Sequence, residues 1–394
     1  MNTTEAVGQD EPSRFARHSG KRPSRLNVLL LASLFKMPYR VLRCVEDAGA
    51  SAFVLGTSSA SGLRHSRYCK KFILTECKIN GGFDPDLASE ISRVAEQWNI
   101  DLVIACDAPT TRALIAVRDL LTVSSFPMPN LIEFDILNNK WKFVALCNSL
   151  NIPCPPTQLI YDSDHLIEKI ESGAIPLPAI AKPLSLDSGR GCIILKSNTY
   201  RKRAAGILVR PILCQSYVEG EDVCASVYCR EGQIVTFTAY KYRRGTYSGF
   251  FSEAIYNAVS RLMRSLNFSG ICNFDMRMAP DGEILFLECN PRCFFNIAMS
   301  MLAGINFIVP GLPLFHRHVP ARPPQPVRIR SLKAILATIY APWRLTKLDG
   351  ALVKYVLSDL VPHVREELGL EKQVPAAWDA FETSRILAEG QYQF

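Results

Sequence analysis

The residues best suited to chemistry lie in a predicted β-hairpin near residue 280. Two strand-like runs, "GICNFDMRMA" and "GEILFLECN", flank Pro280-Asp281-Gly282, which is typical of a hairpin turn. This pairing would place Asp275 beside Glu288 and Asn290, and the last two share a face because they are two positions apart. Such oxygen donors suit Mg²⁺, which completes its octahedron with water and substrate phosphates. Arg292 would share that face and hold a developing anion; the alternative, charges turned to solvent, is disfavoured by the apolar residues between them.

A second candidate cluster is the segment "IAKPLSLDSGRGCIIL". Lys182 lies at the end of a predicted strand, ahead of a loop that contains Ser188, Gly189 and Gly191. The glycines would let backbone N–H groups approach phosphate oxygens, and the Lys would supply positive charge. The pattern is not Walker A, which needs GK[ST] at the start of a helix. The alternative is an ordinary hairpin with a flexible loop.

A third segment, "CQSYVEGEDVCASVY", connects two predicted strands. Gln215, Tyr217 and Val218 lie at the end of one strand, where free backbone groups could contact an adenine edge. Glu221 begins the next strand, and its carboxylate could accept from ribose hydroxyls. Lys140, in "NNKWKF", would add a second phosphate contact, although a Lys at a helix start is usually solvated.

The elements that precede these motifs alternate between buried strands and helices. We expect strands over 26–33, 51–57 and 100–107, with helices over 39–49 and 86–99. This alternation predicts a doubly wound α/β domain, in which ligands bind beyond the carboxyl ends of the strands. Arg112 follows one such end, so it either reaches a ligand or is a solvated residue of a first helical turn.

The pattern changes near residue 125, which divides the chain into predicted regions. Residues 1–25 are expected to be a disordered lead-in, 26–125 the α/β domain, and 126–315 an α+β domain with a helix that ends near 150 and strand-like runs from 179 to 237. The uncharged stretch 294–315 is interrupted by Gly, Pro and Asn, so we interpret it as a buried helix and loop. Residues 316–394 are expected to form a basic, Pro-rich connection and a helical tail. The tail would lie on a membrane or a partner or, more commonly, pack back onto the body of the protein.

The composition excludes several classes of protein. The chain has 394 residues, a net charge of +8, 48% hydrophobic and 21% charged residues, which is typical of a globular protein and excludes wholesale disorder, collagen and coiled coils. None of the 13 Cys forms a CxxC pair, so a structural zinc site is not expected, and a cytoplasmic location is the simplest interpretation. We expect no transmembrane segment, because the apolar runs are too short or are interrupted. The excess charge has a use at the candidate phosphate contacts of Lys140 and Lys182, so we expect no nucleic-acid partner.

The order of these motifs resembles that of the ATP-grasp superfamily, in particular its carboxylate–amine ligases, among them amino-acid ligases and the ATP-binding domain of the carbamoyl-phosphate synthase large chain. The matching motifs are "NIPCPPT", "KPLSLDSGRG", "QSYVEGED" and "DGEILFLECNPR". The resemblance covers about residues 26–315, including a first region similar to the superfamily's pre-ATP-grasp domain. "HSRYCKKF" also looks like the Ser-Arg-Tyr element of amino-acid-ligase-like members.

The resemblance implies a role for each matching residue. Lys140 and Lys182 would contact ATP phosphates beneath the loop over 185–191, and Arg292, with Lys182, would be catalytic. The residues that would line the adenine and the ribose are Gln215, Tyr217, Val218 and Glu221. The ligands of one or two Mg²⁺, with Mn²⁺ as an alternative, would be Asp275, Glu288 and Asn290.

Two positions depart from the pattern of the superfamily. Gln215 stands where Glu is common, which is a mild change because its carbonyl can still accept from the adenine amino group. Asn273 stands where some members have an Arg, which would shift the binding of an acyl phosphate to Arg292, Arg243 or Arg244. The last two lie in "YKYRRGTYSGFF", which is either a lid or an ordinary basic loop.

The resemblance implies an ATP- and Mg²⁺-dependent ligase that joins a small-molecule carboxylate to an amine, with an amino acid or small peptide as substrate. The alternatives are a different acyl acceptor, a thiol or bicarbonate, and a non-catalytic protein that senses ATP. A dinucleotide-dependent oxidoreductase is set aside, because no GxGxxG follows "LNVLLLAS". Dimers are common among the proteins it resembles, so a homodimer is compatible with this interpretation.

Overall fold

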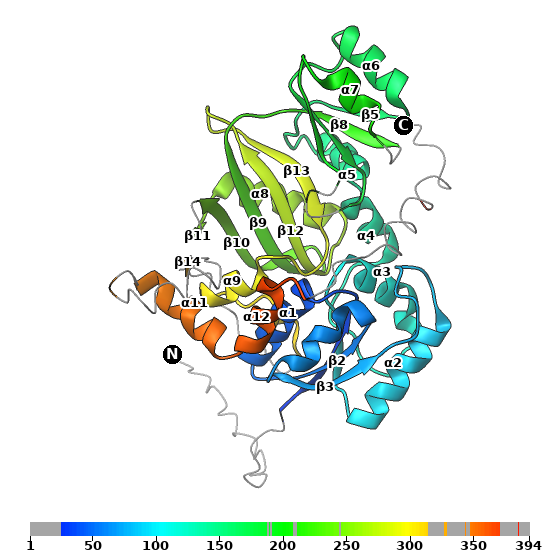
Figure 1. Ribbon diagram of the computed structural model, residues 1–394, viewed down its shortest axis with the longest axis vertical. Coiled ribbons are helices and arrows are strands. Elements are labelled where there is room, and N and C mark those ends of the chain that lie inside the picture. Colours follow the sequence, from blue (N-terminus) through cyan, green and yellow to red (C-terminus); the bar gives the residue numbers. More distant parts are fainter. Residues whose placement is uncertain are drawn as a thin grey trace, which may run out of the picture.

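The computed structural model describes residues 25–186, 189, 191–207, 211–243, 246–313, 327–328, 343, 347–370 and 385. The predicted lead-in over 1–25 lies almost wholly outside the described residues, as does most of the predicted basic connection from 316 onward. Ser188, Arg244 and the side chain of Arg243 also lie outside them. The described strands form three sheets, which Figure 1 shows stacked along the long axis of the molecule.

The first sheet is parallel, has the strand order β3-β2-β1-β4 and lies at the bottom of Figure 1. Alternate residues of β1 pack on opposite faces, Leu30 with helix α1 and Leu29 with helix α2. A helical layer on each face is the doubly wound arrangement, so this predicted fold class is confirmed. The elements of this part are β1 (Asn27–Ala32), α1 (Lys36–Asp47), β2 (Ser51–Gly56), η1 (Ser58–His65), β3 (Cys69–Leu74), α2 (Pro85–Trp98), β4 (Leu102–Ala105), α3 (Ala108–Val117) and η2 (Arg118–Leu120).

Local chemistry sets the ends of these helices. Asp84 caps α2, because its side chain accepts from the backbone N–H of Asp86, and Asn99 ends that helix in a left-handed conformation at φ 49°. The sequence did not predict strand β3, "CKKFIL", because it is an edge strand whose Lys70 and Lys71 are exposed and interrupt any apolar run.

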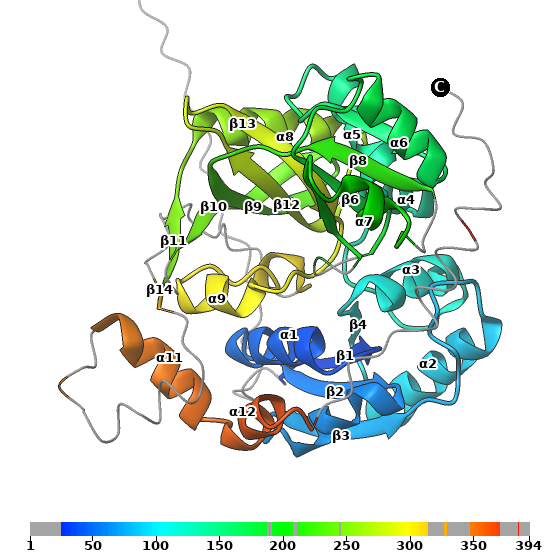
Figure 2. The ribbon, with the colours of Figure 1, turned by 45° about the horizontal axis from the view of Figure 1, so that its top comes forward.

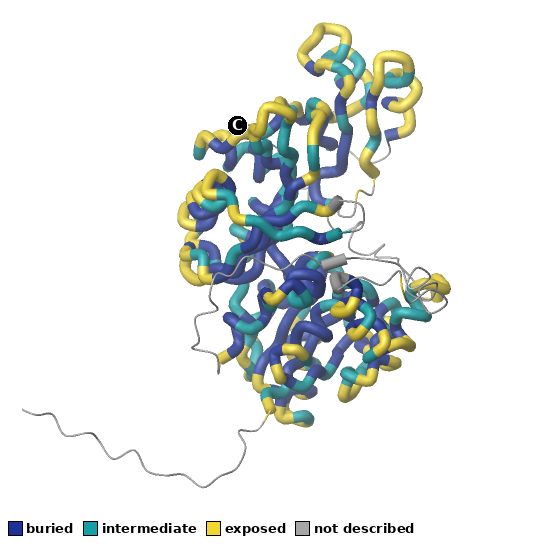
Figure 3. Tube along the Cα trace, turned by 90° about the vertical axis from the view of Figure 1, so that its left-hand side faces the viewer, coloured by how far each residue is buried: buried dark blue, intermediate teal, exposed yellow. Residues whose placement is uncertain are grey.

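A small antiparallel sheet, with the order β5-β8-β6-β7, lies at the top of Figure 1. Figure 3 shows that much of the chain around this sheet is exposed. The predicted run of strands from 179 to 237 is wrong over the short helix α7, which packs with α6 against one face of the sheet. The elements are β5 (Thr157–Ile160), α6 (Ser163–Glu171), β6 (Ala179–Pro183), β7 (Ile193–Leu195), α7 (Tyr200–Ala204) and β8 (Ile212–Ser216).

The large sheet is antiparallel, with the order β13-β12-β9-β10-β11-β14, and occupies the middle of the molecule. Its core packs against helix α8 and against α5 through the rings of Phe143 and Phe274. The predicted buried helix and loop over 294–315 is confirmed for its described part, as α9 and η3. The elements are β9 (Glu221–Arg230), β10 (Gln233–Arg243), β11 (Thr246–Phe250), α8 (Glu253–Ser265), β12 (Gly270–Met278), β13 (Ile284–Asn290), α9 (Ile297–Leu302), η3 (Val309–Gly311) and β14 (Val327–Arg328).

The helix predicted to end near residue 150 is two helices, α4 (Leu131–Asn138) and α5 (Lys140–Ser149). Asn139 separates them because its ψ is 114° and its side chain accepts from the backbone N–H groups of Trp141 and Lys142. An Asn that caps a helix must leave the helical conformation itself, so the break positions Lys140 in the first turn of α5.

The described part of the tail packs back onto the first sheet's helical layer. It consists of α11 (Lys347–Leu357) and α12 (Leu360–Glu367), the orange and red helices beside α1 in Figure 2. Leu352, Tyr355 and Val356 are buried in the same apolar cluster as α1. The sequence left open whether the tail lies on a membrane or a partner, or packs back onto the protein. The described residues of the tail pack onto the protein. None of the helices described is long and apolar enough to cross a membrane.

A buried carboxylate fixes the tail to the rest of the chain. Asp359 accepts from the hydroxyl of Tyr39 at 3.1 Å and from that of Ser66 at 2.5 Å. It also accepts from the backbone N–H of Arg67 at 3.0 Å, while Arg43 of α1 donates to the carbonyl of Tyr355 at 2.9 Å. The segment "HSRYCKKF", which resembles a Ser-Arg-Tyr element, thus contacts the tail.

We predict that Asp359→Ala lowers the free energy of unfolding by about 2–3 kcal/mol, because it leaves buried donors without an acceptor. Urea denaturation measures the change. The matched control is Asp119→Ala, whose side chain is 95% exposed and whose removal should change stability by less than about 0.5 kcal/mol. Equal stability of the two variants would contradict the role of Asp359 as an anchor.

Candidate active site

The predicted hairpin forms with the predicted partners. β12 and β13 pair antiparallel, with Asp275 opposite Glu288 and Asn273 opposite Asn290. The register shifts directly after Asp275, so the strand is irregular at the candidate metal residue. Asp275, Glu288 and Asn290 therefore project together from one sheet face, as the two-residue period requires.

Lys140 joins this hairpin to the small sheet. Its ammonium lies 3.2 Å from Oε2 of Glu288 and donates to the carbonyl of Leu186 at 2.7 Å. Its backbone N–H donates to the carbonyl of Leu184 at 2.8 Å. Only 5% of Lys140 is exposed, so the expectation of a solvated Lys at a helix start is wrong. Lys140 therefore connects the Gly-containing loop to strand β13.

Charge and burial act in opposite directions on these groups. Burial lowers the pKa of Lys182, and the negative charge of Glu288 partly offsets that effect. For Glu288, burial raises the pKa, but the charges of Lys140 and Lys182 outweigh it and hold the pKa below its ordinary value. The two lysines therefore favour the ionised form of Glu288.

Asp275 lies in the least favourable environment for a negative charge. Burial, and then the charge of Glu288, raise the pKa of Asp275. Its carboxylate accepts from Nδ2 of Asn273 at 3.1 Å and from Nδ2 of Asn290 at 3.3 Å. The thiol of Cys224 lies 3.2 Å from the same carboxylate, on the neighbouring strand β9.

These residues fit a hard cation. Two adjacent carboxylates whose charges repel each other would both be stabilised by an ion between them, and an amide oxygen is a further acceptable ligand. Within the described part of the chain, no group of three or more His, Cys, Asp or Glu could hold a metal. The pair Asp275 and Glu288 would therefore have to share the ion with oxygens of a bound phosphate, as Mg²⁺ commonly does. Asn290 would join them only after its amide group turned over, because its Nδ2 points to Asp275 and its Oδ1 accepts from Arg292.

Asn273 takes a structural position in this cluster. Its Oδ1 accepts from the hydroxyl of Ser226 at 2.8 Å and from that of Tyr240 at 3.0 Å. Because two donors fix the amide oxygen, the amide nitrogen points at Asp275. Asn273, which stands where some members of the superfamily have an Arg, thus orients the carboxylate of Asp275.

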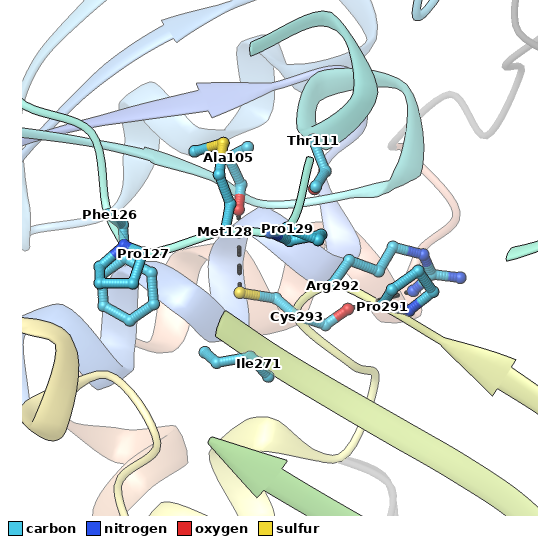
Figure 4. A pocket seen from close by; sticks show the side chains of 10 residues that line it. All are labelled: Ala105, Thr111, Phe126, Pro127, Met128, Pro129, Ile271, Pro291, Arg292 and Cys293. Carbon is cyan, nitrogen blue, oxygen red and sulfur yellow. Dashed lines mark hydrogen bonds between the residues drawn. The ribbon is translucent and has the colours of Figure 1, made fainter. Parts of the chain in front are cut away.

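Arg292 lies where the hairpin leaves the large sheet. It donates to Oδ1 of Asn290 at 2.9 Å and to the carbonyl of Cys293 at 3.1 Å. Figure 4 shows Arg292 at the edge of a small cavity, where the thiol of Cys293 points to the carbonyl of Ala105 at the end of β4. That cavity has a volume of about 20 Å³, enough for one water molecule, so it is a small gap in the packing between the first sheet and the hairpin.

A larger cavity of about 510 Å³, hereafter the cleft, lies over the face of the hairpin that carries Asp275, Glu288 and Asn290. We call this face the metal face. Its lining combines residues of the hairpin, the Gly-containing loop, strands β9 and β10, the first turn of α1 and the segment after β13. The lining residues are Lys36, Met37, Gly189, Cys224, Tyr240, Asn273, Asp275, Glu288, Asn290, Arg292, Phe294, Phe295 and Asn296. The structure thus brings Asp275, Glu288, Asn290, Arg292 and Gly189 to one cavity.

The sequence did not predict six of these lining residues as part of a site: Lys36, Met37, Cys224, Phe294, Phe295 and Asn296. Tyr240 belongs to "YKYRRGTYSGFF", the segment predicted to be either a lid or a basic loop. Cys224 stands opposite Asp275 in the pairing of β9 with β12, which joins strands about fifty residues apart. No local sequence pattern predicts which residues of β9 and β12 lie opposite each other. Tyr240 stacks on Tyr247 across the β10–β11 pair at 4.5 Å between ring centres.

Both described glycines of the loop have a left-handed backbone. Gly189 has φ 70° and Gly191 has φ 72°, a left-handed region that favours glycine. A Cβ at Gly191 would lie 2.7 Å from Cγ of Pro183, whereas one at Gly189 would meet nothing within 4 Å. The buried hydroxyl of Ser185, at the start of the loop, has no hydrogen-bond partner among the residues described, which fits a phosphate contact.

The candidate adenine segment runs from β8 to β9, as predicted. Gln215 is buried and donates from Nε2 to the hydroxyl of Thr157 at 3.0 Å. The carbonyl of Val218 accepts from Arg277 at 3.0 Å. The residues described as lining the cleft include none of this segment, so the assignment of Gln215, Tyr217 and Val218 to adenine stays a prediction.

Glu221 and Arg112 have ion-pair partners. Glu221 accepts from Nζ of Lys241 at 2.8 Å, so its assignment to a ribose stays a prediction. Arg112 is buried and makes a two-pronged ion pair with Asp135, both distances being 2.9 Å, and donates to the carbonyl of Gly81. The expectation of a solvated Arg112 is therefore wrong, because the residue ties α3 to α4. A contact between Arg112 and a ligand stays a prediction.

Comparison with known proteins was made by sequence family, curated sequence and solved structure. Residues 209–335, about a third of the chain, match the family described as "ATP-grasp in the biosynthetic pathway with Ter operon". No curated protein matches the sequence.

Solved structures with the same fold are numerous. The N5-carboxyaminoimidazole synthetase of Staphylococcus aureus has a TM-score of 0.56 and 12% identity, covering 81% of this chain and 88% of that one. The L-amino acid ligase of Bacillus licheniformis has a TM-score of 0.54 and 14% identity, covering 72% and 73%. The biotin carboxylase domain of Hydrogenobacter thermophilus 2-oxoglutarate carboxylase, solved with MgADP and bicarbonate, has a TM-score of 0.56 and 14% identity, covering 72% and 68%. The predicted ATP-grasp fold is confirmed.

We predict that Gly191→Ala lowers the free energy of unfolding by about 1–2 kcal/mol more than Gly189→Ala does. Both variants place a side chain at a positive φ, which costs about 1–3 kcal/mol, but only the first also collides with Pro183. Thermal denaturation of the two variants makes the comparison. Equal losses would show that the loop can move away from Pro183 without cost.

Proposed function

We propose that this protein is an ATP- and Mg²⁺-dependent ligase that activates a carboxylate as an acyl phosphate and couples it to an amine. The observation that carries the proposal is the contact between Lys140 and Glu288 beside Asp275, with Arg292 on the same cleft. This set combines two carboxylates for a cation with buried positive charge for phosphate oxygens. The fold supports it, since the similar structures include an amino acid ligase.

The first step would be phosphoryl transfer. A carboxylate oxygen of the substrate attacks the γ-phosphorus of ATP, the bond to the β-phosphate oxygen breaks, and ADP leaves. Lys140 and Lys182, both buried, would hold phosphate oxygens where water cannot screen their charge. Bound between Asp275, Glu288 and Asn290, Mg²⁺ would neutralise charge on the transferred group.

The second step would be attack on the acyl phosphate. The amine nitrogen adds to the carbonyl carbon, and the bond to the phosphate oxygen breaks. Inorganic phosphate leaves with the electron pair of that bond, and the nitrogen loses a proton to the departing phosphate or to water. Arg292 would stabilise the oxyanion of the tetrahedral species, because its guanidinium is held by Asn290 at the end of the metal strand. Water would have to be excluded from the cleft at this stage, because it would hydrolyse the acyl phosphate.

A screen of carboxylates against amines tests the proposal. Phosphate release from ATP should require both an acid and an amine, and mass spectrometry should find the amide. Phosphate release with bicarbonate or a thiol in place of the amine would favour another acyl acceptor. Binding of MgADP without turnover across the panel would contradict the ligase and favour a sensor of ATP.

We predict that Glu288→Gln lowers turnover about a hundredfold or more, because it removes a charge from the candidate cation site while keeping the volume of the side chain. The matched control is Glu283→Gln, which changes an exposed carboxylate in the turn of the same hairpin and should leave turnover within about twofold. Circular dichroism confirms that both variants fold. Full activity of Glu288→Gln would exclude the assignment of the cation to this pair.

A further inference from the structure

Helix α1 forms one side of the cleft, apart from the hairpin residues of the metal face. The first turn of α1 contributes Lys36 and Met37 to the lining, opposite the hairpin residues Asp275 and Glu288. Figure 2 shows α1 directly below α9, between the large sheet and the first sheet. Lys36 is about one-third exposed in its side chain, so its ammonium remains accessible.

Among the residues that the structure describes, the cations on this side of the cleft outnumber the carboxylates. Lys36 and Arg40, one turn apart on α1, share the carboxylate of Glu366, at 3.8 Å and 3.6 Å. These two cations and one carboxylate leave the described group with one excess positive charge. The first turn of α1, "KMPY", contains no acidic residue, so the partial positive charge of the helix end is uncompensated by its own side chains.

The cations on this side are held in place. Arg40 donates to the carbonyl of Lys36 at 2.8 Å, and its guanidinium stacks over the ring of Phe295 at 3.9 Å from the ring centre. Glu366 belongs to α12, and the buried carboxylate of Asp359 anchors that helix to α1 and η1. The tail therefore fixes the position of the carboxylate that Lys36 and Arg40 share.

The opposite faces of the cleft thus differ in charge. The metal face has two carboxylates and would receive a cation and the triphosphate, while the described part of the α1 side has one cation more than it has carboxylates, and an aromatic ring. A substrate that carries only its reacting carboxylate would leave this excess charge without a further counter-charge from the substrate. Positive charge that lines a cleft attracts an anion to it.

We propose that the α1 side of the cleft binds, through Lys36, an anionic group of the substrate other than its reacting carboxylate, and that Glu366 of the C-terminal tail positions Lys36 for this contact. The group is a carboxylate or a phosphate. The inference rests on the proposed function, because that function makes the cleft the substrate site. It narrows the carboxylate substrates to acids with a second negative group.

The test measures binding to the full-length protein in saturating MgADP, by calorimetry. The probes are three pairs that differ by an anionic group: L-glutamate and L-glutamine, L-aspartate and L-asparagine, and O-phospho-L-serine and L-serine. We expect at least one anionic member to bind about tenfold tighter than its neutral partner. The first two pairs report on a carboxylate, and the third reports on a phosphate.

Three variants assign the contact. Lys36→Met keeps the length of the side chain and should reduce the difference within the pair to less than about threefold, whereas Lys36→Arg should keep it. The matched control is Lys70→Met, which removes an exposed charge from edge strand β3 and should change nothing. Glu366→Gln should weaken the binding of the anionic member severalfold and leave the binding of the neutral member unchanged.

The outcomes separate this inference from the proposed function. No preference for the anionic member in any pair, or a preference that survives in Lys36→Met, would overturn the inference. Tighter binding of the anionic member to Glu366→Gln would show that Glu366 competes for Lys36, which contradicts its positioning role. Preference through Lys36 without phosphate release for any acid and amine would overturn the ligase and leave the anion subsite standing.

Discussion

The contact between Lys140 and Glu288 is the interaction on which the arrangement of the candidate site depends. It joins the first turn of α5, the loop after β6 and the strand β13, three segments that are far apart in the sequence. A buried charge without a partner costs several kcal/mol, so each of these two groups stabilises the other's position. The metal face, the phosphate loop and the small sheet are thereby held in one geometry. A change in any of the three would leave a buried ion uncompensated.

The same electrostatics leaves the site ready for a cation. The two lysines stabilise the negative charge of Glu288, but Asp275 remains buried beside it and its pKa is raised. The hydrogen bonds from Asn273 and Asn290 and the neighbouring thiol of Cys224 are weaker compensation than a full charge. The protein therefore keeps one carboxylate in an unfavourable state, as expected where a ligand completes the charge balance.

What the sequence predicted correctly was local. The hairpin from 270 to 290 follows from a turn of Pro280-Asp281-Gly282 and a two-residue period, so the pairing of Asp275 with Glu288 needed no other part of the fold. Cys224 and Lys36 reach the cleft through strand pairing and helix packing between distant segments, which no short pattern records. The burial of Arg112 was missed for the same reason, since its partner Asp135 lies on another helix.

Helix α1 shows why the tail matters to the site although it lies outside the cleft. Lys36, Tyr39 and Arg43 share one face of α1 because they are three, four and seven positions apart. Lys36 lines the cleft at the start of the helix, while Tyr39 and Arg43 bond to Asp359 and Tyr355, in a segment about three hundred positions further along the chain. The other face of α1, with Val41, Leu42 and Val45, packs in the apolar cluster of the first sheet. A helix of twelve residues held only by the sheet could rotate or shift by fractions of a turn at little cost. Packing against the tail as well removes that freedom, and the position of Lys36 then follows from the backbone.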